Sequence, residues 1–246
     1  MPFIRSVLHM LFLAVTVIPW ASAVFVIRLF AGPTAVYWAC ARWLKLSVDS
    51  GTVILGIQNR ITGMENLPTG ALDSAVLLCK HQSTWEALLM PAIMPRPLAY
   101  VFKKELLYVP FFGWAMACMD MIHIDRSQGS QAFKKMVASG KRLTEQGTWI
   151  IMFPEGTRID RGQVGEFKTG GTRLAIQCGV PVIPIAVTSA KCWPRKAFIK
   201  KPGIVDISIG KPIPSVGRRP DELMAEVQAW IEAEMHRLDP EAYPPQ

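Results

Sequence analysis

Two short polar segments contain residue types that catalysis and the binding of an anionic substrate require. Lys80–Glu86 reads KHQSTWE and places a histidine five positions before a carboxylate. Phe153–Arg158 reads FPEGTR and places an acid, a glycine, a hydroxyl and a guanidinium close together. A histidine paired with a carboxylate can take a proton from an alcohol, and an arginine can bind a phosphate through two parallel hydrogen bonds. The first segment can therefore activate an alcohol, and the second can hold a phosphate.

The histidine lies between a predicted strand, Ala75–Cys79, and a predicted helix, Thr84–Ile93. Five residues is the wrong spacing for two side chains on one face of an ideal helix. We therefore expect His81 in the turn, with Glu86 reaching back from the first helical turn to orient the imidazole and raise its basicity. The alternative is structural, because Ser83 and Glu86 have the spacing of a capping box, which needs no catalysis.

The FPEGTR segment follows a strand predicted over Trp149–Phe153. Gly156 permits a close approach of the backbone, Thr157 supplies a hydroxyl, and Arg158 offers a bidentate phosphate contact. Glu155 either accepts hydrogen bonds from a hydroxylated substrate or holds an arginine. A turn with a charged rim is the alternative that needs no ligand.

Two more basic side chains are candidates for binding an anion. Arg126 follows the apolar strand Met121–Ile124; it either binds phosphate through its planar guanidinium or forms a weak surface ion pair with Asp125. Lys168 precedes two glycines and a predicted helix, a setting in which backbone N–H groups also attract anions. The spacing is not that of a P-loop, so nucleotide binding is not expected.

Beyond residue 56 the chain alternates between short apolar strands and helical stretches. The predicted strands are Ala75–Cys79, Ala99–Phe102, Met121–Ile124, Trp149–Phe153, Val182–Val187 and Ile204–Ile209. The predicted helices are Thr84–Ile93, Gln131–Gln146, Thr172–Cys178 and Asp221–Arg237. This alternation favours an α/β fold with a largely parallel sheet flanked by helices.

Two features of the C-terminal half have open interpretations. Pro184 stands in the middle of the buried strand Val182–Val187, where proline cannot donate to the ladder. It either ends a ladder beside a ligand groove or marks an edge strand. The segment Lys191–Lys201 mixes basic and aromatic residues, which suits either an anionic membrane surface or a solvated loop.

The first 30 residues predict a membrane helix. No charge interrupts Met10–Ile27, a stretch long enough for a span and longer than the apolar core of a usual signal peptide, which is the alternative. Pro19 would kink this helix. Arg5 and Arg28 flank it on both sides, so a re-entrant hairpin with both ends cytoplasmic would explain the charge pattern.

The segment 34–50 follows a Gly-Pro break and predicts an amphipathic helix. Its charges recur at i, i+3 and i+7 and form one stripe: Arg42, Lys45 and Asp49. This helix either lies at a membrane interface or packs on the core. We therefore divide the chain into a membrane-associated helical hairpin over 1–55, an α/β domain over 56–240 and a frayed tail over 241–246.

Composition narrows the classes of partner. Half of the residues are hydrophobic and the formal net charge is +8, which favours an anionic partner. The apolar N-terminus favours lipid over nucleic acid, and no nucleic-acid module is recognisable. Five scattered cysteines without CxxC spacing argue against a zinc site or a disulfide framework. The absence of a GxSxG motif disfavours an α/β-hydrolase.

Taken in order, KHQSTWE, the strand ending at Arg126, FPEGTR and the strand around Pro184 resemble the glycerolipid acyltransferases. The specific resemblance is to bacterial 1-acyl-sn-glycerol-3-phosphate acyltransferases of the PlsC type, and it covers about half of the chain, Gly63–Val187. It implies the family's α/β fold and a catalytic dyad of His81 and Glu86. Most of the family has aspartate at the position of Glu86, and the extra methylene lengthens the reach of the side chain by roughly one bond.

The resemblance also implies what the other blocks bind. Arg126 and the residues Glu155, Gly156, Thr157 and Arg158 would bind the glycerol phosphate, with Lys168 as a further phosphate contact. The strand around Pro184 would belong to the acyl-donor site. The substrates would be lysophosphatidic acid and an acyl thioester, either acyl-CoA or acyl carrier protein. No metal or bound cofactor would be needed, and the site would face the cytoplasm from the bacterial inner membrane.

Other functions stay open on the sequence alone. Another lysolipid, such as lyso-ornithine lipid, or glycerol 3-phosphate would use the same dyad. A thioesterase would use the same dyad to activate water. If Glu86 cannot replace aspartate, the protein would bind lipid without catalysis. Because no Ser or Cys is placed to be acylated, we expect a ternary complex rather than an acyl-enzyme. Acyl chain length would depend on an apolar tunnel near Tyr108–Met119.

Overall fold

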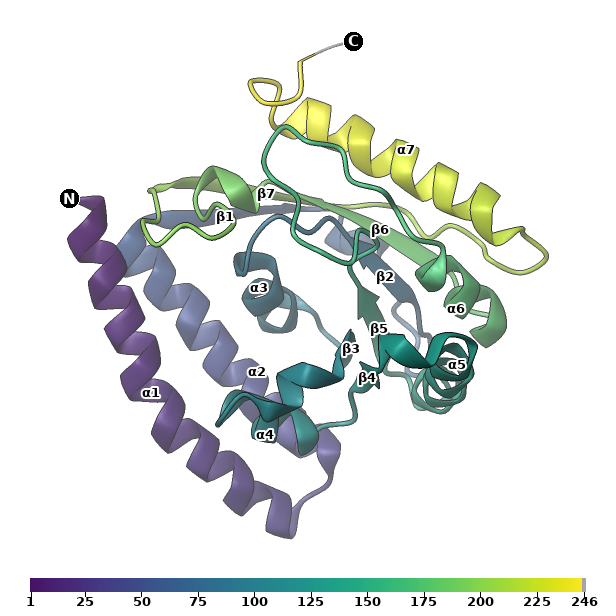
Figure 1. Ribbon diagram of the computed structural model, residues 1–246, viewed down its shortest axis with the longest axis horizontal. Helices are drawn as coiled ribbons and strands as arrows, with labels where there is room; N and C mark the ends of the chain where they lie inside the picture. The colour runs from purple at the N-terminus through teal and green to yellow at the C-terminus, as the bar shows by residue number, and fades with distance from the viewer. Residues whose placement is uncertain (245–246) are drawn as a thin grey trace.

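In the computed structural model, which describes residues 1–244 except for the side chain of Arg126, seven strands form one mixed sheet (Figure 1). The order across the sheet is β1-β7-β6-β2-β5-β3-β4. The strands are β1 Ile57–Thr62, β2 Val76–Cys79, β3 Leu98–Lys103, β4 Ile122–Ile124, β5 Trp149–Met152, β6 Val182–Val187 and β7 Gly203–Ile209.

Neighbouring strands run parallel except for β6 and β7. In the centre, β2 pairs with both β5 and β6. Because these three strands are parallel, the segments that follow them emerge at the same carboxyl edge, where ligands gather in open α/β sheets. The predicted fold class, a largely parallel sheet flanked by helices, is confirmed.

The sequence patterns above do not predict strand β1. Its residues, IQNRIT, alternate in burial and only Ile57 is fully buried. The reason is its position, because β1 lies at the edge of the sheet and pairs only with β7. A polar edge strand lacks the apolar run that identifies buried strands.

Helices cover the two faces of the sheet (Figure 1). Alternation along each strand sends successive side chains to opposite faces. Leu77 and Cys79 of β2 pack with residues of α2 and α3, whereas Val76 and Leu78 pack with residues of α5, α6 and α7. The helices are α1 Pro2–Phe30, α2 Pro33–Ser50, α3 Trp85–Ile93, α4 Phe112–Ala117, α5 Gly129–Glu145, α6 Gly170–Cys178 and α7 Pro220–Leu238.

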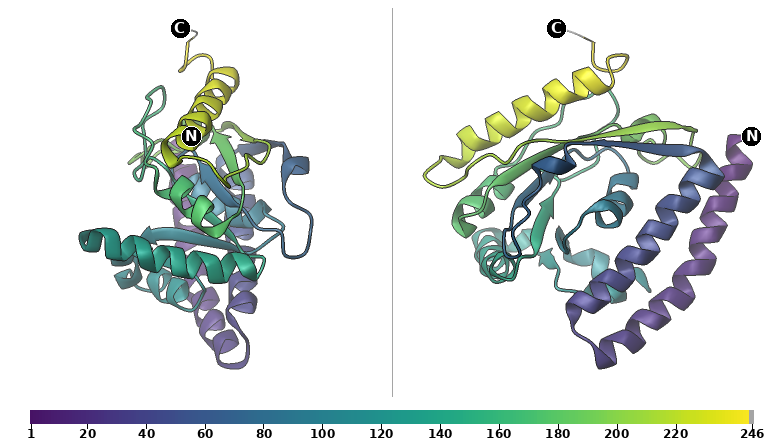
Figure 2. Two further views of the ribbon diagram at one scale, coloured as in Figure 1. Left: turned by 90° about the vertical axis from the view of Figure 1, so that its right-hand side faces the viewer. Right: turned by 180° about the vertical axis from the view of Figure 1, so that it is seen from behind.

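The two N-terminal helices form a hairpin at one side of the domain (Figure 2). Helix α1 continues through Pro19 for 29 residues, and within residues 1–244 it is the one helix long and apolar enough to cross a membrane. Helix α2 packs on α3 and contributes Tyr37 and Val48 to the core. The predicted charged stripe lies on its exposed side. The apolar face of α2 therefore packs on the core, which was one of the two expectations for residues 34–50.

The C-terminal tail differs from the prediction that 241–246 is frayed. Tyr243 is buried, and its hydroxyl accepts a hydrogen bond from Gln82 Nε2 at 2.6 Å. Just before the tail, Asp239 accepts two hydrogen bonds from Arg161. These contacts dock the tail as far as Tyr243, and residues 245–246 lie outside the described part of the chain.

Candidate active site

The turn after β2 holds His81, as predicted, and Glu86 is the second residue of α3. From this first helical turn the carboxylate reaches back, and its Oε1 atom lies 2.9 Å from His81 Nδ1. The histidine and the carboxylate therefore meet despite a spacing that no single helix face allows.

The Glu86 carboxylate is completely buried and meets three donors besides the imidazole. Its Oε1 atom accepts hydrogen bonds from the backbone N–H groups of Gln82 and Ser83 at 2.7 and 2.6 Å. Its Oε2 atom accepts one from the Ser189 hydroxyl at 2.6 Å. The contact with Ser83 is the reach-back half of a capping box. Helix capping and pairing with histidine, which the sequence leaves as alternatives, therefore occur together.

The imidazole of His81 is oriented from a second direction by an aromatic ring. The ring of Phe153 stacks on it with centroids 3.9 Å apart and an angle of 14° between the planes. The His81 side chain remains 18% exposed, and Nε2 has no hydrogen-bond partner among the described residues. A general base needs a ring nitrogen without a protein partner, because that nitrogen takes the proton from the substrate.

The FPEGTR segment lies against the start of α3. The N–H of Ile159 donates to the carbonyl of His81 at 2.8 Å, which joins the two polar segments directly. The Arg158 Nη1 atom donates to Thr84 Oγ1 at 3.0 Å, while Arg195 donates to the Arg158 carbonyl at 2.7 Å. The turn needs Gly156, which has a φ of +66°. The guanidinium of Arg158 therefore lies at the start of α3, beside Thr84, which is two residues along the chain from Glu86.

Glu155 has a different environment from its neighbours in the segment. Its side chain is fully buried and its Oε1 atom lies 3.5 Å from Nζ of Lys80, which also contacts Glu232 at 2.7 Å. Burial raises the pKa of Glu155 to about 7, against the opposing charge of Lys80. The charged partner of the Glu155 carboxylate is thus a buried lysine, and the arginine that the sequence suggested as its partner is not in contact with it among the described residues. In this structure it joins the loop to β2 and α7.

The two remaining basic candidates lie at the surface or outside the description. Lys168 has an exposed side chain, and its backbone N–H donates to Pro154 O at 3.0 Å, which brings it beside the FPEGTR loop. The side chain of Arg126 lies outside the described part of the structure. Asp125, considered as its ion-pair partner, contacts Nζ of Lys104 at 2.6 Å, and this ion pair lowers the pKa of the Asp125 carboxyl.

Pro184 lies in the central strand β6, so the expectation of an edge strand is wrong. The β6–β7 register begins at Ile185, and Pro184 accepts a hydrogen bond from the Gly210 N–H at 2.9 Å without donating one. The β6–β7 ladder thus stops next to Pro184, whereas the β2–β6 pairing continues through it with Leu78 opposite. A ligand groove beside Pro184 stays a prediction. A Cβ built at Gly210 would meet both the Pro184 ring and the Trp230 ring, at 2.7 and 2.9 Å, so Pro184 lies on the side of β6 near α7. His81 stacks on Phe153, beside the cluster that packs under α2 and α3, so the fold does not bring Pro184 together with the dyad.

Sequence reasoning did not assign four partners: Lys80 and Thr84, which lie within KHQSTWE itself, and Ser189 and Arg195, which come from distant segments. One signal for Ser189 was present. It lies two residues beyond the predicted strand Val182–Val187, and parallel strands bring such residues to the same edge of a sheet.

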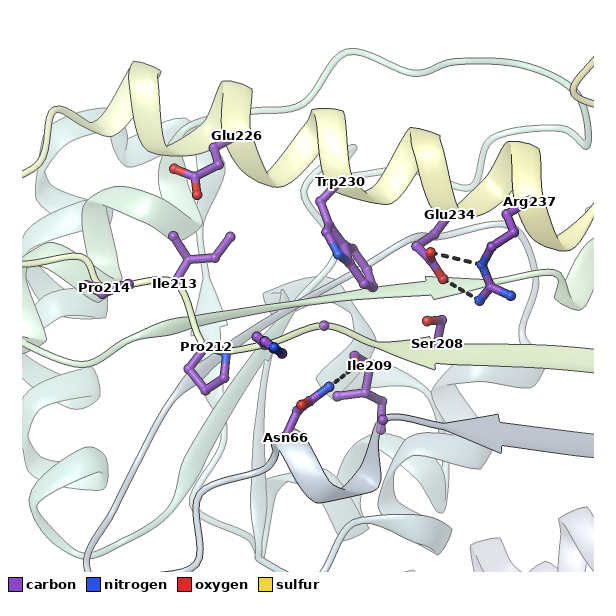
Figure 3. A pocket seen from close by; sticks show the side chains of 13 residues that line it. Asn66, Ser208, Ile209, Pro212, Ile213, Pro214, Glu226, Trp230, Glu234 and Arg237 are labelled. Atoms are coloured by element: carbon purple, nitrogen blue, oxygen red, sulfur yellow. Dashed lines mark hydrogen bonds and ion pairs between the residues drawn. The ribbon is translucent and has the colours of Figure 1, made fainter. Parts of the chain in front are cut away.

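Two hollows lie away from the dyad. One is completely apolar and is lined by residues of α1 and α2 together with Phe111, Phe112, Ala115, Met116 and Met119. It includes much of the segment predicted to line an acyl tunnel. The other lies between the end of β7 and α7, where Trp230 points down from α7, Arg237 pairs with Glu234, and Asn66 lies on the opposite side (Figure 3). None of the predicted site residues lines this second hollow.

A histidine–carboxylate pair at the carboxyl edge of an α/β sheet, with the guanidinium of Arg158 close by, is typical of enzymes that use acid–base catalysis. The chain belongs to the acyltransferase family, whose model matches residues 58–188, more than half of the chain. This match contains both dyad residues and the whole FPEGTR segment. The resemblance seen in the motifs is confirmed.

Individual relatives agree with this assignment. A 1-acyl-sn-glycerol-3-phosphate acyltransferase of Pseudomonas aeruginosa is 38% identical over 241 residues, which cover 96% of this chain and 92% of the relative. A protein of the same name from Saccharomyces cerevisiae is 28% identical over 90% of this chain and 72% of its own length. The crystal structure of PlsC, the 1-acyl-sn-glycerophosphate acyltransferase of Thermotoga maritima, superposes with a TM-score of 0.80 at 22% identity, covering 97% of this chain and 98% of that one. That likeness shows that the fold is shared.

Proposed function

We propose that this protein transfers a fatty acyl group from an acyl thioester to the sn-2 hydroxyl of 1-acyl-sn-glycerol 3-phosphate, giving phosphatidic acid. The observation that carries the proposal is the buried dyad of His81 and Glu86 beside Arg158. The name of the Pseudomonas relative, which matches nearly the whole chain, supports the choice of acceptor.

In the proposed mechanism, His81 Nε2 takes the proton of the sn-2 hydroxyl while Glu86 stabilises the imidazolium that forms. The oxygen attacks the thioester carbonyl, and the tetrahedral intermediate collapses with cleavage of the C–S bond. The thiolate then leaves and takes the proton from His81. The atoms balance without a bound cofactor, because the thioester supplies the acyl group. The oxyanion requires backbone N–H donors.

We assign the substrate phosphate to Arg158, with Arg126 and Lys168 as further candidates and with Gly156 and Thr157 shaping the loop. The ion pair between Arg158 and a phosphate would be strengthened by the two-pronged geometry of the guanidinium. In this proposal Glu155 holds the FPEGTR loop in place through its contact with the buried Lys80. The strand around Pro184 remains our candidate for the acyl-donor side in this proposal.

We further propose that the protein acts at the bacterial inner membrane with its site on the cytoplasmic side, using either acyl-CoA or acyl carrier protein as donor. The exposed apolar surface of α1 supports membrane association, and the net charge of +8 suits an anionic bilayer.

The test is thiol release from a long-chain acyl-CoA by the full chain in mixed micelles, with and without lysophosphatidic acid. Release that requires the lysolipid, with phosphatidic acid as the product, is the expected result. Equal release without lysolipid would identify a thioesterase instead. If no thiol appears, acyl carrier protein and lyso-ornithine lipid are substituted as donor and acceptor, and failure of every pair would refute acyl transfer.

A further inference from the structure

Ser189 is a buried hydroxyl that none of the motifs includes. It follows β6 and begins a short 3-10 turn, Ser189–Lys191. Its side chain has no exposure to solvent, and its Oγ atom donates to Glu86 Oε2 at 2.6 Å. The two residues are 103 positions apart in the sequence, so only the parallel pairing of β6 with β2 brings them together.

The backbone around this hydroxyl is held firmly. The preceding residue, Thr188, exchanges hydrogen bonds with Asp206 of β7: Thr188 N–H donates to the Asp206 carbonyl, and Thr188 Oγ1 accepts from the Asp206 N–H. The carbonyl of Ser189 accepts from the N–H groups of Cys192 and Trp193. Both sides of Ser189 are therefore fixed by backbone contacts, which makes its hydroxyl a rigid reference point for Glu86.

The two oxygens of Glu86 have separate tasks. Oε1 faces His81 and the start of α3, whereas Oε2 accepts from Ser189 alone among the described residues. A glutamate has one more rotatable bond than an aspartate, so contacts at Oε1 alone leave the carboxylate plane free to turn. A donor at Oε2 stops that rotation and keeps a buried oxygen paired.

We propose that Ser189 is a positioning residue for the dyad. In this proposal Ser189 orients Glu86, and Glu86 in turn orients His81. This inference rests on the proposed role of the dyad. Ser189 does not touch the reacting atoms. It holds the Glu86 carboxylate in the plane in which Oε1 meets His81 Nδ1.

The experiment compares kcat and the KM for lysophosphatidic acid in the wild type and in Ser189→Ala. We expect kcat to fall roughly 10- to 100-fold, the range for loss of a hydrogen bond to a charged group, with the KM changed by no more than about twofold. Ser215→Ala is the matched control, because Ser215 is equally buried and donates one 2.6 Å hydrogen bond to the Val180 carbonyl, away from the dyad. This control should keep its kcat.

A double-mutant cycle with Glu86→Gln separates positioning from general destabilisation. If Ser189 acts through the carboxylate, Ser189→Ala should cost no more than about twofold in the Glu86→Gln background. Equal losses in both backgrounds would overturn the proposal. Ser189→Cys, which keeps a weak donor, should fall between the wild type and Ser189→Ala, and it replaces the alanine variant if that protein does not fold.

The same assay distinguishes this inference from the proposed function. Full activity in His81→Ala would refute the dyad itself. Loss of activity in His81→Ala together with a wild-type kcat in folded Ser189→Ala or Ser189→Cys would refute only the role of Ser189. Thermal melting of each variant reports whether it is folded.

Discussion

At the residue scale, Glu86 combines two roles that the sequence presents as alternatives. The same oxygen accepts from the start of α3 and meets the imidazole, so the helix cap holds the catalytic partner in place. Capping explains why the carboxylate can be buried without a cation, because backbone N–H groups and a hydroxyl satisfy it. The consequence is that removing its charge should affect rate and stability unequally.

Glu86→Gln is expected to lower turnover roughly 10²- to 10⁴-fold, because a neutral amide cannot stabilise the imidazolium. Its free energy of unfolding should fall by only about 1 kcal/mol, the usual scale for a cap. Steady-state assays and urea titrations measure the two effects, with His81→Ala as the reference for loss of the base. A folded Glu86→Gln protein with near-normal turnover would leave Glu86 as a cap only.

Glu155 provides a prediction about pH. Burial raises its pKa from 4.5 in the unfolded chain to about 7 in the folded protein. The folded state therefore binds this proton more tightly, so the associated stability is complete below about pH 4.5 and is lost as pH rises through 7. Glu155→Gln cannot ionise. Between pH 5 and 8.5 the wild type should lose on the order of 3 kcal/mol more unfolding free energy than the variant.

Urea titrations of both proteins at the two pH values check the Glu155 prediction. The difference between them is the informative quantity, because every other titrating group is shared. Parallel changes in the two proteins would show that Glu155 keeps its ordinary acidity beside Lys80.

At the scale of elements, the FPEGTR loop and the start of α3 form one unit. Arg158 binds Thr84, and Ile159 binds the carbonyl of His81. The loop after β5 is therefore attached to the turn after β2, and a phosphate held by Arg158 would lie at a defined place relative to the imidazole. A substitution in the loop should accordingly alter the binding of acceptor more than that of donor.

Arg158→Ala is expected to raise the KM for lysophosphatidic acid about tenfold or more, because a charge-assisted hydrogen bond to phosphate is lost. The KM for the acyl donor should stay within about twofold. Arg158→Lys tests the geometry, since it keeps the charge and loses the fork, and it should fall in between. An effect confined to the donor KM would contradict the phosphate assignment.

The end of α2 also bears on the dyad through Trp85, the residue before Glu86. A Cβ added at Gly51 would come 2.5 Å from the Trp85 ring. That ring is fully buried, and its Nε1 donates to Asn59 Oδ1 at 2.8 Å, so it has little room to move.

We expect Gly51→Ala to destabilise the protein by about 1–3 kcal/mol, the cost of overpacking, and to lower kcat through displaced Trp85. Thermal melts and steady-state assays measure both effects. Gly32→Ala is the control, because nothing lies within 4 Å of a Cβ at that position, and it should behave like the wild type. Equal melting temperatures for the two variants would disprove the tight contact.

At the scale of the whole molecule, α1 is an outer layer with one face still uncovered. It packs on α2 and α4, yet Leu11, Val15 and Ile18 remain 50%, 69% and 51% exposed. An exposed apolar surface of this length is typical of sites that contact a membrane. The hairpin is joined to the core through α2 and α3, so a bilayer that holds α1 would also hold the dyad near its surface.

Replacing Leu11, Val15 and Ile18 together by serine should reduce binding to vesicles of phosphatidylethanolamine and phosphatidylglycerol by roughly tenfold or more, because each buried side chain contributes about 1.5 kcal/mol or more. Co-sedimentation measures the bound fraction. Serine at Leu72, Val164 and Val216, which are equally exposed on loops, is the control and should bind normally. Undiminished binding of the α1 variant would assign membrane contact to another surface.

The sequence by itself determined the features that depend only on residues close together along the chain. Apolar runs predict β2, β5 and β6 because buried strands are hydrophobic on both faces. KHQSTWE predicts the dyad because both of its members lie in one short segment between a strand and a helix. The charged stripe of α2 is visible for the same reason, since helical periodicity is local.

Only the tertiary structure decided which distant residues complete the site. Ser189 reaches Glu86, and Lys80 reaches Glu232, across 103 and 152 positions. Those contacts follow from the order in which strands pair and helices cover the sheet. Strand pairing depends on the summed packing of many side chains and leaves no signal in any one segment. For that reason β1, a polar edge strand, also becomes visible only through its pairing with β7.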